Sequence, residues 1–201
     1  MDLSRYLNKV VNRILSDEWR IGWFKVEENI DINGIKCKYL LYGHSRHFKK
    51  YKPVFLSRFL SYQIIPYGAA AIIFVVDYID ISIIEKIINA VKRFVEKTRF
   101  TTPEGIEWEV DVAYVAILSR EIGRGVDEYV SSIFRGIING QYMMYEGFRG
   151  RVNKRIGLVI VNYEDEEIYS GDDMFSREAH RLFNPKSSIL EKITKLFHKE
   201  E

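Results

Sequence analysis

Residues 69–76 form the longest uninterrupted apolar run of the chain, Ala-Ala-Ala-Ile-Ile-Phe-Val-Val. A strand with one solvated face alternates apolar and polar residues, so this run predicts a strand over 69–79 that is buried on both faces. The run is far shorter than the roughly 20 residues that span a bilayer as a helix. A strand buried on both faces requires covering elements on each side of its sheet, which predicts a layered α/β protein.

The segments that follow the run supply such elements. Ile84, Ile87, Ile88, Val91 and Val95 recur at helical spacing. Two starts fit this helix: Ser82 with Glu85 as a capping box, or Asp80 as the N-cap. Residues 107–119 predict a second strand and residues 126–137 a second helix, so the order is strand–helix–strand–helix. This order predicts a mixed central sheet with flanking helices.

The two ends of the chain extend this core. Residues 3–16 predict an amphipathic helix capped by Asp2 or Ser4. Two β-prone runs then flank Asn33-Gly34, the strongest short signal for a hairpin. We interpret the chain as a single domain, 1–201, with a core of about 3–138 and C-terminal strands and a helix in 140–201. The C-terminal part comprises predicted strands at 142–148 and 156–163, an acidic patch at 164–173 and a final helix at about 187–198.

Composition narrows the class of protein. The chain has 201 residues, of which 47% are hydrophobic and 29% charged, as in globular proteins. The single Cys37 excludes an internal disulfide and a Cys-based zinc site. The first residues are amphipathic and unlike a signal peptide, so we expect a cytoplasmic protein without a membrane anchor. Abundant Ile, Lys and Glu with only two Gln resemble the composition of thermophile proteins.

Charge is unevenly distributed along the chain. No acidic residue occurs between Asp31 and Asp77, although the net charge of the whole chain is only +2. Lys and Arg neutralise phosphates, and the nearby rings of Phe48 and Tyr51 can stack on unpaired bases. We therefore predict a nucleic-acid-binding surface in the basic segment 43–62, expected to be a loop with a short helix at 54–61, and in the basic turn 149–155. The residues expected to bind are Arg46, Lys49, Lys50, Lys52, Arg58, Arg149 and Arg151. A solvated basic loop without a partner is the alternative.

Other patterns suggest further sites. Glu107, Glu109 and Asp111 alternate and would share one strand face, where carboxylates can hold Mg²⁺. An exposed strand end is the alternative.

The turn 119–125 could receive an anion or could be an ordinary connection. His44 and His47 have a spacing that suits a metal on a helix, although no third ligand is evident. Asp77 ends the apolar strand, a position that often borders a ligand crevice.

Residues 3–119 run helix, strand, strand, strand, helix, strand. This order resembles the core of the restriction-endonuclease-like, PD-(D/E)xK nuclease superfamily, which includes archaeal Holliday-junction resolvases. The segment 115–129 resembles the strand–loop–helix that closes that core in some members. The resemblance implies Mg²⁺ held by carboxylates, for which Asp31 and Asp77 are the nearest candidates and Asp77 the expected metal ligand.

The sequence departs from that pattern because it contains no D/E-x-K triplet. Ile79 stands where a Lys is expected after Asp77, so Lys49, Lys50 or Lys86 would have to supply the amine. The resemblance therefore favours nucleic-acid binding more than nuclease activity.

These observations predict a protein that binds DNA or a branched DNA intermediate, with a divergent Mg²⁺-dependent nuclease as the enzymatic version of that function. We also expect a homodimer, because apolar helices at both chain ends would be free to pack on a partner. The alternative is a structural or assembly protein that acts through homo-oligomer or partner contacts, its basic stretch facing the acidic patch of a neighbour. A weaker third option is a small-molecule enzyme that uses the 119–125 turn.

Overall fold

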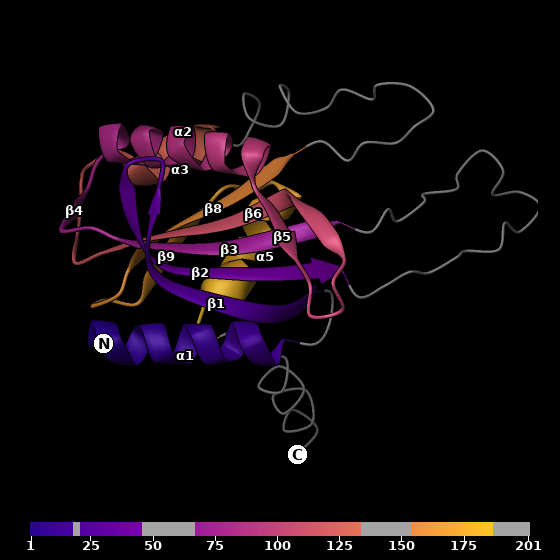
Figure 1. The fold of residues 1–201 in the computed structure, drawn as a ribbon. Coiled ribbons are helices and arrows are strands. Elements are labelled where there is room, and N and C mark those ends of the chain that lie inside the picture. The colour runs from indigo at the N-terminus through magenta and orange to yellow at the C-terminus, as the bar shows by residue number, and fades with distance from the viewer. Residues whose placement is uncertain (18–20, 46–66, 134–153, 187–201) are drawn as a thin grey trace, which may run out of the picture.

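The computed structural model describes residues 1–17, 21–45, 67–133 and 154–186 (Figure 1). A mixed sheet forms the middle layer, with helices α2 and α3 over one face and α1 and α5 over the other. The α/β class and the flanking helices are therefore confirmed. The strands follow the order β1 (Ile21–Ile32), β2 (Ile35–Ser45), β3 (Gly68–Val75), β6 (Glu107–Ser119), β8 (Arg155–Asn162) and β9 (Glu167–Ser170), and β5 (Arg99–Thr101) also pairs with β6.

Strand direction gives this sheet two distinct ends. β3, β6 and β8 are parallel, and they are connected through α2 (Ile81–Lys97) and α3 (Val126–Ile133). β1, β2 and β3 form an antiparallel meander, and β9 is antiparallel to β8. We call the end where β3, β6 and β8 begin the amino end, and the opposite end the carboxyl end. The amino end lies on the right in Figure 1.

The apolar run forms the central strand β3, and its burial on both faces is confirmed. Ala70, Ile72 and Phe74 pack beneath α2 and α3, whereas the alternate residues pack against α1 and α5. The prediction of one strand up to residue 79 was wrong at its end. β3 stops at Val75, and a separate short strand, β4 (Tyr78–Ile79), pairs with β7 (Glu121–Ile122) in a second sheet. The chain leaves the main sheet just before Asp77, whose side chain is exposed.

The predicted hairpin joins β1 and β2. Asn33 and Gly34 have φ angles of 50° and 88°, the positive values that a two-residue hairpin turn requires. The Asp31 carboxylate accepts a hydrogen bond from Gly34 N at 2.7 Å, and Asn33 Nδ2 donates to the Ala90 carbonyl at 2.8 Å. The turn is therefore fastened to α2, and Asp31 has a structural role in it.

The first helix, α1 (Leu3–Ser16), begins at Asp2, whose carboxylate accepts from Ser4 N and Arg5 N. Its apolar stripe is buried against the sheet and α5 (Met174–Phe183). The Tyr6 hydroxyl, fully buried, donates to the Phe183 carbonyl at 2.6 Å. The expectation that this stripe is free for a partner was wrong, because it packs within the molecule.

Several boundaries differ from the sequence prediction. Asp80, rather than Ser82 with Glu85, caps α2, because its carboxylate accepts from Ile83 N at 2.8 Å. The acidic patch contains β9 and ends at Asp173, the N-cap of α5. The segments predicted at 54–61, 134–137, 142–148 and 187–198 lie outside the described residues. No helix of the described residues is long and apolar enough to cross a membrane.

Candidate nucleic-acid interface

The first basic segment, residues 46–66, begins and ends at the amino end of the sheet. It connects β2 to β3, which pair with His44 opposite Gly68. Ser45 N donates to the Tyr67 carbonyl at 2.9 Å, and Tyr67 N donates to Ser45 Oγ at 3.0 Å. These two hydrogen bonds close the neck of the segment, so its two ends are held side by side.

The second segment, residues 134–153, ends at the same end of the sheet. It leads into Lys154 and β8, whose first residue, Arg155, pairs with Val112 of β6. We call Ser45 and Tyr67 the first neck, and Lys154 with the start of β8 the second neck. In the order β2-β3-β6-β8, the two necks lie on four adjacent strands. At about 4.8 Å per strand, they are within roughly 14 Å of one another. Both ends of the first run and the C-terminal end of the second thus meet the body at the amino end of the sheet (Figure 1).

Charge separates these segments from the rest of the protein. Residues 46–66 contain five Lys or Arg and no acid, and residues 134–153 contain three Arg and one Glu, together +7. The remainder of the chain carries −5, which gives the total of +2. All seven predicted nucleic-acid-binding residues fall in these segments and lie outside the described residues. Attraction of a polyanion must come from the segments, since the described body is net negative.

Between the two necks, a bulge in β6 places Asp111. Gly68 of β3 pairs with Val110 and Ala69 pairs with Val112, so Asp111 has no partner residue in β3. Its carboxylate accepts a hydrogen bond from Gly68 N at 3.1 Å. On the other side, Lys154 Nζ lies 3.6 Å from Asp111 Oδ1 and donates to the Val110 carbonyl at 2.9 Å. Asp111 therefore contacts residues that flank both basic segments.

Burial affects the charge of this carboxylate. The side chain of Asp111 is only 17% exposed. Burial raises its pKa above the usual value, and the hydrogen bond from Gly68 and the charge of Lys154 act in the opposite direction. Asp111 is thus a partly desolvated carboxylate held by one amide and one ammonium group.

The neighbouring carboxylates are also paired. Glu109 accepts from Lys154 Nζ at 3.1 Å and from Arg99 at 3.1 Å. Glu107 is exposed. Within the described ranges, no group of three or more His, Cys, Asp or Glu residues is arranged to hold a metal ion. Glu109 and Asp111 are therefore engaged with cations of the protein itself.

An aromatic cluster lies beneath the first neck. The His44 ring stacks on Trp108 with 5.3 Å between centroids and 14° between planes. Phe24, Tyr42 and Phe100 continue the cluster, with neighbouring centroids 5.1–5.8 Å apart. His44 is engaged in packing, and His47 lies outside the described residues. The cluster packs side chains of β1, β2, β5 and β6 together next to the first neck.

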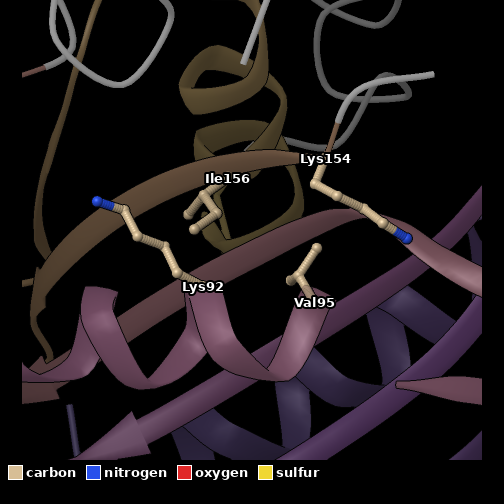
Figure 2. Close-up of a pocket in the computed structure, with 4 residues that line it drawn as sticks. All are labelled: Lys92, Val95, Lys154 and Ile156. Carbon is tan, nitrogen blue, oxygen red and sulfur yellow. The ribbon is translucent and has the colours of Figure 1, made fainter. Parts of the chain in front are cut away.

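A shallow recess lies between α2 and β8, beside the second neck. It is lined by Lys92, Val95, Lys154 and Ile156 (Figure 2). The two lysines extend in different directions over an apolar floor. Because Lys154 is engaged with β6 and the recess is too tight for a ligand, we do not assign it a small-molecule role.

The predicted catalytic carboxylates lie at the other end of the sheet. Asp77 lies two residues after the end of β3, and Asp31 precedes the β1–β2 turn. With eight residues in β3, the carboxyl end is about 25 Å from the necks. β2 lies between β1, which carries Asp31, and β3, which Asp77 follows. Both carboxylates therefore lie far from Ser45, Tyr67 and Lys154, the described residues that flank the basic segments.

The 119–125 turn also lies at the carboxyl end. Ser119 Oγ donates to the Asp77 carbonyl at 2.7 Å and accepts from Glu121 N at 3.1 Å. Gly123 N donates to the Ile79 carbonyl at 2.8 Å. These amides already have partners within the protein, which favours an ordinary connection over an anion site.

Comparison of the chain with protein-family models, curated proteins and solved structures finds no match. The Glu107–Asp111 alternation and the basic turn 149–155 were predicted from the sequence as separate features. The structure joins them, because Lys154, near the end of that turn, pairs with Glu109 and Asp111. Their opposite charges were visible, but nothing in the spacing indicates a contact across more than 40 residues.

Proposed function

We propose that the protein binds nucleic acid, with DNA as its ligand, through the two basic segments at the amino end of the sheet. The observation that carries this proposal is the common origin of the segments. The first run begins after Ser45 and ends before Tyr67, and the second run ends before Lys154. These flanking residues lie on four adjacent strands of one sheet. Two cationic segments whose ends meet adjacent strands would contact more phosphates than one segment alone.

The distribution of charge gives the proposal a definite form. The segments carry +7 against −5 for the rest of the chain, so DNA would be attracted at the amino end and repelled elsewhere. Each phosphate contact releases counterions, which makes the affinity fall steeply with salt. Phe48 and Tyr51 add rings that can stack on unpaired bases, as in a branched or single-stranded ligand.

The order of elements agrees with the resemblance to the restriction-endonuclease-like core and supports the same proposal. The chain runs α1, β1, β2, β3, β4, α2, β5, β6, so the short strands β4 and β5 are additions to that order. The long strands lie side by side in the order β1-β2-β3-β6. Asp31 and Asp77 nevertheless lie about 25 Å from the necks. We therefore propose binding as the function and assign no cleavage step to these two residues.

The rival assembly function loses part of its support. It required free apolar faces on the terminal helices, and the stripe of α1 is buried on the sheet. Salt dependence separates the two functions, because contacts between apolar faces do not weaken steeply as salt rises.

The decisive experiment measures binding of labelled duplex, single-stranded and four-way-junction DNA by fluorescence anisotropy at several salt concentrations. Replacing Lys49, Lys50 and Lys52 together by Ala should weaken binding at least tenfold and lower the salt slope by about one unit per lost phosphate contact. The matched control replaces three exposed lysines of the described body, Lys9, Lys36 and Lys86, by Ala. It makes the same change in net charge and should alter affinity much less.

Equal losses in the two triple variants would show that net charge alone matters and would remove the basic segment from the site. A wild-type protein that binds none of the three DNA forms at low salt would reject the proposal. Adding Mg²⁺ to the same samples tests cleavage, and any cleavage that Asp77→Asn abolishes would restore the carboxyl end as a catalytic site.

A further inference from the structure

The β6 bulge is the feature that connects the two basic segments. A bulge leaves one residue without a partner and can redirect its side chain, and bulges often occur beside functional sites. Here the extra residue is Asp111, on the strand that lies between β3 and β8. Those two strands are the ones that begin immediately after the basic segments.

Both carboxylate oxygens of Asp111 contact residues at the start of these two strands. Oδ2 accepts from Gly68 N, two residues after the first segment, and Oδ1 faces Nζ of Lys154, the first residue after the second segment. Lys154 is itself only 21% exposed and is further held by Glu109 and the Val110 carbonyl. Loss of the Asp111 charge would therefore loosen both necks together.

We infer that Asp111 is the common anchor of the two basic segments and acts as a positioning residue for nucleic-acid binding. The inference rests on the proposed function. Asp111 acts indirectly, because it is an anion and does not itself attract DNA. It holds the residues that flank both segments in place, which lowers the conformational-entropy cost of binding DNA.

This role predicts a change opposite in sign to that of simple electrostatics. Asp111→Asn removes a negative charge from the end of the sheet that faces a polyanion, and charge alone would make binding slightly tighter. Loss of the anchor makes it weaker. Glu107→Gln is the matched control because it makes the same charge change on the same strand. Its side chain is exposed and has no hydrogen bond or ion pair with the described residues of either neck.

The test uses the full chain and two readouts. Hydrogen exchange followed by mass spectrometry reports the amides at 67–70 and 154–157, and anisotropy reports binding of the labelled DNA duplex. In Asp111→Asn, exchange should quicken at both necks and binding should weaken about fivefold, the equivalent of one typical hydrogen bond. Glu107→Gln should leave exchange unchanged and binding equal or slightly tighter.

Each outcome decides the inference. Unchanged exchange at both necks in Asp111→Asn would overturn the anchor. Faster exchange with unchanged binding would overturn its positioning role. If wild type bound no DNA, the proposed function and the positioning role would both fail, while exchange would still decide the anchor. Should Asp111→Asn fail to fold, Lys154→Gln serves instead, and it should quicken exchange at 154–157 but not at 67–70.

Discussion

A side chain at Gly68, the first residue of β3, would clash with the neighbouring strand β6. Gly68 lies opposite the β6 bulge, and a Cβ there would lie well inside van der Waals contact of the Glu109 carbonyl oxygen. The same Cβ would be 3.0 Å from Cε1 of Phe100. The oxygen belongs to the backbone, so no rotamer change can relieve the contact. In Gly68→Ala, the start of β3 must move away from β6.

The cost of this movement can be estimated from two contributions. Forcing a methyl group into a filled site costs about 1–3 kcal/mol. Moving Gly68 also weakens its 3.1 Å hydrogen bond to Asp111, which adds about 1 kcal/mol. Alanine restricts the unfolded chain more than glycine, which returns roughly 0.5 kcal/mol. We expect Gly68→Ala to lower the free energy of unfolding by about 2.5 kcal/mol, or Tm by roughly 5–10 °C for a chain of this size.

Thermal unfolding followed by circular dichroism measures this change, and urea titration checks that the m-value is unchanged. Gly105→Ala is an informative comparison, because Gly105 has φ of 81° but open space around its missing Cβ. Its cost should be the backbone strain alone, about 1–2 kcal/mol. A Gly68→Ala protein as stable as wild type, or more stable than Gly105→Ala, would refute the close approach of β3 and β6.

Two further predictions concern groups whose pKa is shifted by burial. Cys37 is buried, and burial raises its pKa to about 12. Iodoacetamide should therefore label Cys37 of the native protein at pH 8 far more slowly than that of the urea-unfolded protein. Equal labelling rates would contradict this prediction. Burial lowers the pKa of His180, in the last turn of α5. The folded state therefore binds fewer protons than the unfolded state. The contribution of His180 to the free energy of unfolding is fully present above the unfolded pKa of about 6.5. It is lost as the pH falls from there to the lowered pKa of the folded state. Urea titrations between pH 7.5 and 5.5 should show this loss in wild type and a smaller one in His180→Gln, and identical profiles would exclude His180 as the source.

Local sequence patterns predicted those elements whose structure depends on near neighbours. The 69–76 run, the Asn33-Gly34 turn and the 3–16 stripe each carry a complete signal within a few residues. The α5 helix was missed although Ala179, Leu182 and Phe183 lie on its buried face. Its acidic surroundings suggested a solvated patch, and the Asp173 cap was counted as one more charge.

The candidate site could be predicted only in part. Charge segregation identified both basic segments, because a local excess of cations is a property of the sequence itself. Their common origin depends on strand order, and the contact of Asp111 with Lys154 depends on a bulge. Neither follows from spacing, since each is fixed by pairing between strands far apart in the chain.

The closed neck between Ser45 and Tyr67 has a consequence for how such a protein can diverge. The free-energy cost of closing a loop depends only logarithmically on its length, so halving the 21 residues between these positions changes that cost by about 0.6 kcal/mol. The two hydrogen bonds at the neck involve none of those 21 residues. The hydrogen bonds that hold Ser45 beside Tyr67 therefore stay available when the length or sequence between these residues changes. Residues 46–66 can diverge in evolution at a small cost in the free energy of folding.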